Sequence, residues 1–569
     1  MYEYFKCKIE KTEIRLPLIN EINNYVNKII KKDIPRINYD TYKNFYKLGI
    51  RKEFEDLYFE RRKQLSAIGL YLQWNTSEKI LEYFQELLWE ISNEFSWCLA
   101  AHLSYDENGF KGDSEKIIDL FSAETAQTLS ELLIIHADKI DTILSNHIKN
   151  QIRNRVITPF LNNVWEWETA KHNWSAVCGS CLGIVGLLME KGDVQEKILE
   201  KVDRALEYYI SGFGEDGITL EGISYWTYGF GYYIYYQEMR EKLTNSNNQY
   251  SEKIKKICNM PESIQISEGR FLPFSDVPQI MEVPSGLISY LYKRFKINLP
   301  KISKITSFEF DNCYRWAHLS RNLWWTSNEI IDNELKDKSI YFSDAQWLIY
   351  RKNMFLAIKC GSNNEPHNHN DVGNLVIALN GELILTDLGA GLYTAGYFGS
   401  ERYTYDHTRS YWHSVPIVNG YEQTENDLKN EVIKNNVTEE KVEFKIEISN
   451  AYQSNQIDSL YREIQLDDNK DEFILEDSFK FKHCKSINEG FISTIKPVKI
   501  SENEVIWTGV NGNLILNYDN KNLKCFIESK MTNDHYGNKI TIYRLGLSIL
   551  NITEEFKTIF KFRYFYDLD

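Results

Sequence analysis

The feature that most constrains the fold is a change in the spacing of apolar residues along the chain. Up to about residue 300, apolar residues recur every three or four positions, as they do over 128–135, which predicts amphipathic helices. From about residue 339, short runs of β-branched and aromatic residues are bounded by turn residues, which predicts strands. A chain of 569 residues exceeds one ordinary core, so we expect two or more domains, with a connector at about 300–338.

The first part of the chain predicts helices in succession. They cover residues 79–95, 123–135, 139–160, 175–190 and 194–211. No strand pattern lies between them and no strict sequence repeat relates them, which is typical of an all-α toroid or solenoid.

The second part predicts an antiparallel β-sandwich or a related stack of sheets. The expected strands cover residues 339–342, 346–350, 354–359, 375–379, 383–385, 442–448, 461–466, 472–478 and 514–518. Asn-Gly pairs at 380–381, 419–420 and 511–512 are turn signals, and the first of them is typical of a tight hairpin. Regularly spaced strands with such turns favour antiparallel sheets.

Charge and hydropathy exclude two classes of partner. A net charge of −15 argues against nonspecific nucleic-acid binding, which depends on Lys and Arg, but a local cationic groove can still bind an anionic substrate. The chain contains no run of 18 apolar residues, so we expect no membrane span. The oligomeric state stays open, a homo-oligomer included.

The expected location is the cytoplasm. The first residues lack a basic stretch followed by an apolar one, and nine scattered cysteines suit free thiols in a reducing compartment. If a signal was removed, the protein is periplasmic or secreted. Aromatic residues make up 14% of the chain; they suit stacking on sugar rings, although filling a large core explains them more simply.

A histidine-rich stretch is the strongest functional signal. Four of the eleven histidines, His367, His369, His407 and His413, fall within residues 367–413. In a strand, His367 and His369 would project from one face, and Asp387 and His413 can complete a His/Asp/His metal set. The spacing suggests one histidine for proton transfer and one for the metal.

Two motifs in the helical part also offer polar groups for a site. His172-Asn173-Trp174 precedes an apolar helix, so Asn173 is either a helix N-cap or an amide that binds an anionic oxygen. Tyr225 and Tyr228 lie three residues apart on one helical face, where they either pack or supply a general base.

These three motifs, in this order and in these two parts of the chain, resemble the heparinase II/III-like polysaccharide lyases. The resemblance implies an α+β multidomain protein: an N-terminal (α/α) toroid over residues 1–310 and a C-terminal antiparallel β-sandwich over 311–569. It also implies an active site in the cleft between the two domains. The implied reaction is β-elimination at a uronic acid, which leaves a 4,5-unsaturated uronate.

The resemblance also implies roles for individual residues. Asn173, helped by His172, would neutralise the substrate carboxylate. Tyr228 is the best match for the proton-transfer tyrosine by its spacing, with Tyr225 as the alternative, and His367 matches the catalytic histidine. One divalent metal ion, structural in role, would be bound; zinc comes first, with manganese or calcium as alternatives. Its implied ligands are His369, Asp387 and His413.

The expected substrate is a uronate-containing glycosaminoglycan: heparan sulfate, chondroitin sulfate or hyaluronan. Alginate is the nearest alternative substrate. Two other functions are less favoured: a metal-dependent hydrolase, whose H-E-x-x-H motif is absent, and a non-catalytic carbohydrate-binding protein. For the arginines that are candidate substrate ligands, ordinary loop salt bridges are the alternative. The candidate substrate-binding residues are Trp174, Trp226, Arg402, Tyr405 and Arg409.

Overall fold

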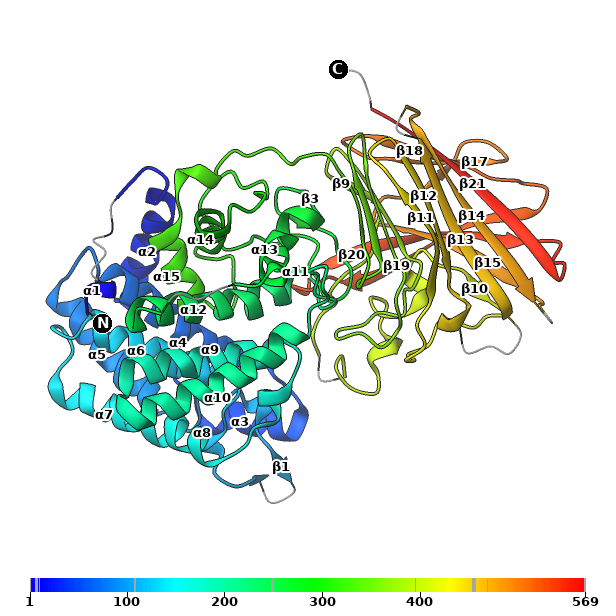
Figure 1. Ribbon diagram of the computed structural model, residues 1–569. Coiled ribbons are helices and arrows are strands. Elements are labelled where there is room, and N and C mark those ends of the chain that lie inside the picture. Colours follow the sequence, from blue (N-terminus) through cyan, green and yellow to red (C-terminus); the bar gives the residue numbers. More distant parts are fainter. Residues whose placement is uncertain are drawn as a thin grey trace.

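A helical domain is followed by a domain of antiparallel sheets, which confirms the expected fold class (Figure 1). The computed structural model describes residues 2–5, 9, 11–106, 109–246, 250–394, 396–452, 457–467, 469–481 and 484–566. Within these ranges, no helix is both long enough and apolar enough to cross a membrane.

The helical domain is built around a buried helix that carries the His172-Asn173-Trp174 motif at its start. Its α-helices include α1 (Tyr2–Phe5), α2 (Leu16–Ile29), α3 (Tyr39–Leu48), α4 (Lys52–Tyr71), α5 (Glu78–Ser92), α6 (Leu120–Ile135), α7 (Thr142–Ile152), α8 (Thr158–Asn162), α9 (Asn173–Met189), α10 (Gly192–Ser211), α11 (Ile223–Tyr225), α12 (Gly231–Thr244), α13 (Glu252–Ile264), α14 (Ser285–Phe295) and α15 (Trp316–Trp325). Helix α9 packs against α6, α10 and α12, and small residues let its neighbours approach closely. A Cβ atom at Gly183 would meet the Tyr236 ring. This packing fixes the position of Asn173.

Two expectations about the helical domain are corrected. The helix expected over 139–160 is divided into α7, a π-helical turn at Arg153–Ile157, and α8. Pro159, in the first turn of α8, cannot donate a backbone hydrogen bond, which explains the break. Helix α15 packs against α14, α4, α6 and α12, with Trp316 buried, so the helical domain extends past residue 310.

In the residues that the structure describes, the second domain contains three antiparallel sheets. The five-stranded sheet consists, in order, of β5 (Lys338–Phe342), β6 (Trp347–Arg351), β7 (Phe355–Lys359), β8 (Leu375–Leu379) and β9 (Glu382–Leu385). The eight-stranded sheet has the order β11 (Glu431–Val437), β12 (Lys441–Glu447), β13 (Ile457–Asp467), β14 (Glu472–Phe481), β21 (Glu555–Phe565), β18 (Asn513–Asn517), β17 (Glu504–Thr508) and β16 (Val498–Lys499). The four-stranded sheet has the order β10 (Ile417–Val418), β15 (Ile487–Ser493), β20 (Lys539–Ile549) and β19 (Leu523–Asn533).

The five-stranded sheet is covered on both faces. Along β6, Trp347 and Ile349 belong to the core shared with the helical domain, whereas Leu348 and Tyr350 belong to the core between the sheets. This explains why β6, β7 and β8 are buried at every position, while β12 alternates between buried and less buried residues. The loops of this sheet therefore lie against the helical domain, where the site forms.

Candidate active site at the domain interface

Residues from both domains line a cleft with a volume of about 420 Å³. The helical domain contributes Tyr225 and Tyr228, and the loop after β4 (Arg270–Phe271) contributes Asp276. The sheet domain contributes Tyr393 and His535. The cleft thus lies where the two domains face each other, which is a common place for a ligand site, and two of the candidate residues, Tyr225 and Tyr228, line it.

His367 lies in a turn and not in the expected strand. Its φ is +59°, a left-handed conformation that non-glycine residues rarely adopt and that often marks functional sites. The prediction that His367 and His369 project from one face of a strand is therefore wrong. The two side chains nevertheless converge, because both hydrogen-bond to the carboxylate of Asp276.

The imidazole of His367 is held between groups from the helical domain. Its ring stacks on the Tyr225 ring, with centroids 3.9 Å apart and planes 21° apart. Its Nδ1 lies 2.9 Å from Asp276 Oδ2, and its Nε2 lies 3.6 Å from Glu221 Oε1. The contact with Asp276 favours a proton on Nδ1 and leaves Nε2 available for proton transfer.

The start of α9 lies beside the same group. His172, and not Asn173, is the N-cap: its Nδ1 accepts a hydrogen bond from the Trp174 N–H at 3.4 Å. Burial lowers the pKa of His172, and the nearby His367 lowers it further. Asn173 is buried, and its backbone N–H is close enough to the carboxylate of Glu221 to lower the pKa of that group. Asn173, Glu221 and His367 therefore form one polar group.

Glu221, which is not among the candidate residues named from the sequence, is a buried carboxyl group of the site. Burial raises its pKa to about 7, against the opposing effects of His367 and the Asn173 N–H. Among the described residues, its Oε1 has no hydrogen-bond partner. A buried carboxyl group that is partly protonated near neutral pH can donate a hydrogen bond to an anionic ligand.

The two candidate tyrosines have different surroundings. Tyr225 contacts His367 directly, and its hydroxyl lies 3.3 Å from that of Tyr393. The Tyr228 ring instead lies under the guanidinium of Arg315, at 3.9 Å from the ring centroid. Burial and the nearby Glu124 raise the pKa of Tyr228 well above its usual value. The geometry favours Tyr225, the alternative in the sequence analysis, as the partner of His367.

Asp276 is the central residue that the sequence analysis missed. It is fully buried, and besides the two histidines it accepts hydrogen bonds from Tyr397 and Arg402 at 2.9 and 3.1 Å. Burial alone would raise its pKa, but the hydrogen bonds from His367 and His369 hold that pKa well below its usual range. No sequence motif surrounds Asp276, so only the tertiary structure identifies it.

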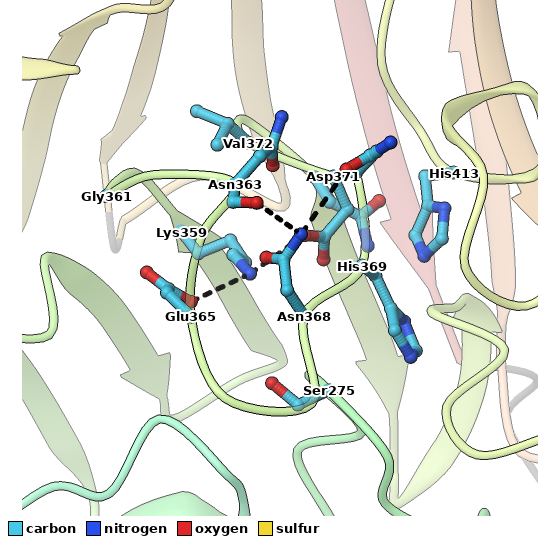
Figure 2. A network of polar contacts seen from close by, with 12 residues as sticks. Ser275, Lys359, Gly361, Asn363, Glu365, Asn368, His369, Asp371, Val372 and His413 are labelled. Atoms are coloured by element: carbon cyan, nitrogen blue, oxygen red, sulfur yellow. Dashed lines mark hydrogen bonds and ion pairs between the residues drawn. The ribbon is translucent and has the colours of Figure 1, made fainter. Parts of the chain in front are cut away.

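A second polar group lies inside the sheet domain, and Figure 2 shows three of its members, His369, Asp371 and His413. Ligand atoms of His369, Asp371, Asp387 and His413 lie within 4.8 Å of one another, and all four residues are buried. Nδ1 of His369 and Nε2 of His413 have no hydrogen-bond partner among the described residues. Asp371 is already paired with Lys359 at 2.8 Å. The three ligands expected from the sequence are therefore placed together, with His369 Nδ1 and His413 Nε2 at 3.6 and 3.4 Å from the carboxylate of Asp387.

Neighbouring groups orient these side chains as they commonly do around metal ions. Nδ1 of His413 lies 2.9 Å from the carbonyl oxygen of Arg409, so its N–H points there and Nε2 stays free as a ligand. The side-chain amide of Asn374 donates to Asp387 Oδ2 at 2.7 Å. A His/Asp/His donor set with these supports fits a divalent metal ion.

Three expected substrate ligands have structural partners instead. Trp226 is fully buried, and its Nε1 donates to the carbonyl of Ile257 at 2.9 Å. Arg402 donates to Asp276 and, at 2.9 Å, to the carbonyl of Asn368, so it holds the loop that carries His367. Arg409 pairs with Glu422, which is the loop salt bridge considered as the alternative. The polar groups of these three side chains are thus engaged by the protein itself.

The other two expected ligands are more accessible. Trp174 is half-buried, with its ring 5.2 Å from that of His102. The hydroxyl of Tyr405 lies 2.7 Å from that of Thr394. Trp174 follows Asn173 directly in the chain and therefore stays a candidate for sugar contact.

A family model matches part of the chain, and solved structures share its fold. Residues 336–500 match the family described as Heparinase II/III-like, C-terminal, whereas no curated protein sequence matches the chain. A crystal structure of heparinase III has a TM-score of 0.67 and 14% identity, covering 99% of this chain and 88% of that one. Heparan sulfate lyase HepC from Pedobacter heparinus has a TM-score of 0.64 and 12% identity, covering 99% and 87%. A chondroitin AC lyase mutant from Streptomyces coelicolor A3 has a TM-score of 0.51 and 9% identity, covering 97% and 83%. These matches confirm the expected resemblance and the toroid-plus-sheet fold.

Proposed function

We propose that this chain, which carries the C-terminal domain of the heparinase II/III-like family, is a polysaccharide lyase that cleaves uronate-containing glycosaminoglycans by β-elimination. The observation that carries the proposal is the stack of His367, from the sheet domain, on Tyr225, from the helical domain, beside Asn173 and Glu221. This arrangement supplies proton-transfer groups next to groups that bind a carboxylate.

The first requirement of the reaction is to neutralise the uronate carboxylate. The proton on C5 is weakly acidic because the adjacent carboxylate already carries a negative charge. Hydrogen bonds from Asn173 and from the protonated form of Glu221 would let the carboxylate accept the charge that develops when C5 loses its proton. The raised pKa of Glu221, about 7, supports this role near neutral pH.

The second requirement is to move one proton from C5 and another to the departing O4. Nε2 of His367 and the hydroxyl of Tyr225 are the two groups that can do this. Because their rings stack, they approach a sugar from one side, which suits syn elimination. In a glucuronate unit the C5 hydrogen and O4 lie on the same side, so we propose glucuronate-containing polymers as the substrates. The electron pair of the C5–H bond forms the C4–C5 double bond as the C4–O4 bond breaks, and no water is consumed.

We further propose that His369, Asp387 and His413 bind one divalent metal ion, with zinc the first choice from the donor set. The ion would balance buried negative charge and keep the loop of His367 in place. His369, Asp387 and His413 would then only position the loop of His367, while His367 and Tyr225 transfer the protons.

Removing the metal is expected to lower stability. Dialysis against a chelator should lower the thermal unfolding temperature by about 5–10 °C, because a bound ion stabilises the folded state. Elemental analysis should find about one metal ion per chain in the untreated protein, and the His413→Ala variant should hold none. An unchanged unfolding temperature, with activity lost and then restored by several different metals, would instead indicate a catalytic metal and a hydrolase.

Glu221 should make stability and activity depend on pH. The folded state keeps this proton up to about pH 7, whereas the unfolded chain releases it near 4.5. The free energy of unfolding therefore falls as pH rises through this interval, by about 3 kcal/mol more in the wild type than in Glu221→Gln. Urea unfolding of both proteins at pH 4.5 and 8 measures this difference. The same substitution should weaken the fall of kcat/KM above pH 7. An equal stability difference at both pH values would contradict the assignment.

An ultraviolet absorbance assay for the unsaturated uronate tests the proposed function. Heparan sulfate, chondroitin sulfate, hyaluronan and alginate are incubated with the protein side by side. Rising absorbance on a glucuronate polymer supports the proposal. Rising absorbance on alginate alone would show that the substrate is alginate and not a glycosaminoglycan. New reducing ends without absorbance would show a hydrolase. If none of the four is cleaved, the proposal for glycosaminoglycans is wrong.

A further inference from the structure

The turn between β19 and β20 reaches the cleft from a part of the chain beyond the family match, which ends at residue 500. His535 and Tyr536 in this turn line the cleft together with Tyr225 and Asp276. Tyr536 is nevertheless 58% exposed. Its ring has an edge-on contact with that of His535 at 5.2 Å and is otherwise largely open to solvent, so a ligand in the cleft can reach it.

The turn is held in one conformation by its own hydrogen bonds. The carboxylate of Asp534 accepts the backbone N–H groups of Tyr536 and Asn538 at 2.9 and 2.8 Å and the Asn538 side-chain amide at 3.0 Å. Gly537 has a φ of +83°, which glycine adopts without strain. The Tyr536 backbone is therefore fixed before any ligand binds.

The turn is also tied to both sides of the cleft. The hydroxyl of Tyr536 donates to the carbonyl of Ile280, on the helical side, at 3.3 Å. Nδ1 of His535 lies 3.1 Å from the carbonyl oxygen of Gly391. The His535 ring packs edge-on against Tyr393 at 4.7 Å, and the Tyr393 hydroxyl lies 3.3 Å from that of Tyr225. A short series of contacts thus connects Tyr536 with the proposed catalytic pair.

We propose that Tyr536 is a sugar-stacking residue, which binds one ring of the polysaccharide at a distance from the uronate that is cleaved. The apolar face of a sugar ring packs on the face of an aromatic ring, and a ring that is fixed beforehand loses little conformational entropy on binding. The ligand class is a neutral or anionic hexose unit of the chain. The inference rests on the proposed function for the identity of the polymer.

The test compares Tyr536→Leu and Tyr536→Phe with the wild type on heparan sulfate oligosaccharides of four and eight sugars. Leu keeps apolar volume but removes the flat ring, whereas Phe keeps the ring and loses only the hydrogen bond to Ile280. Tyr421→Leu is the matched control, because Tyr421 is 62% exposed on the same domain and does not line the cleft. Thermal unfolding shows whether each variant is folded.

Tyr536→Leu should raise KM for the eight-sugar substrate about fivefold, in line with the loss of one aromatic contact, and leave kcat unchanged. The change for the four-sugar substrate should be smaller, and Tyr536→Phe and Tyr421→Leu should behave as the wild type. An unchanged KM at both lengths, or a fall in kcat with KM unchanged, would overturn the proposal. If Tyr536→Leu does not fold, Tyr536→Ser takes its place.

A failure of the proposed function is recognised separately. If the wild type forms no unsaturated product from these oligosaccharides, calorimetric binding of the eight-sugar oligosaccharide to the intact protein still tests the subsite. Binding that is about fivefold weaker in Tyr536→Leu and unchanged in Tyr421→Leu supports the subsite without catalysis. Equal binding by all three proteins, or no binding by the wild type, overturns it.

Discussion

Replacing Tyr225 by Phe is expected to lower kcat/KM by about a thousandfold, whereas Tyr228→Phe should lower it less than about tenfold. Tyr225 stacks on His367 at 3.9 Å, so its hydroxyl is placed to exchange a proton with the same sugar unit. Tyr228 instead lies under Arg315; burial raises the pKa of both tyrosines, so the contact with His367 is what distinguishes Tyr225. Because Phe keeps the ring, the stack on His367 survives and only the hydroxyl is lost.

The measurement is the initial rate of absorbance increase on the best polysaccharide substrate, under conditions where kcat and KM are both determined. Thermal unfolding of the two Phe variants should match the wild type within about 2 °C, because neither substitution leaves a large cavity. If Tyr228→Phe is the inactive variant, the assignment of Tyr225 is wrong and the order of preference from the sequence is correct. Full activity in both variants would assign both proton transfers to His367.

Replacing Asp276 by Ala is expected to lower the free energy of unfolding by about 3–5 kcal/mol, the usual effect of removing one partner from a buried charged group. Its carboxylate lies 3.1 Å from Arg402 and also binds His367, His369 and Tyr397. The substitution would leave Arg402 with an unpaired charge at the domain interface. It should also release His367 from its orientation and lower kcat by at least about a hundredfold.

Urea unfolding at equilibrium measures the stability change, with Asp138→Ala as the control. Asp138 is exposed, and its side chain forms only a surface contact with Lys139 at 3.4 Å, so its removal should change stability by less than about 0.5 kcal/mol. If Asp276→Ala is as stable as this control, Asp276 does not hold the interface together. A stable variant with low activity would restrict its role to positioning His367.

The elements of the fold that follow from local periodicity could be predicted from the sequence. Helix α6 and strand β8 have nearly the expected bounds, because the length of an apolar run separates a buried helix from a buried strand. The π-helical turn at Arg153–Ile157 could not be predicted, since apolar spacing continues through it. Nor could the place of α15, which joins the helical domain through contacts with helices far earlier in the chain.

Part of the candidate site could also be predicted from the sequence. The H-x-H pair with Asp387 and His413 contains residue types that are rare together without a shared role, and the structure places His369, Asp387 and His413 together. The argument that located His367 on a strand face failed, because His367 adopts a left-handed turn. Arg402 and Trp226 looked like ligands by residue type alone, but their partners are protein groups.

The sequence by itself determined that the chain has a helical part and a sheet part. It also identified His367, the proposed metal ligands and Asn173 as candidates for one active site. Only the tertiary structure decided that Tyr225 contacts His367, that Asp276 joins His367 to His369, and that Tyr536 reaches the cleft. The physical reason is that the spacing of apolar residues and the short motifs depend on residues that are close together in the chain. Contacts across a domain interface depend on how two separately folded surfaces pack, and no local pattern records that packing.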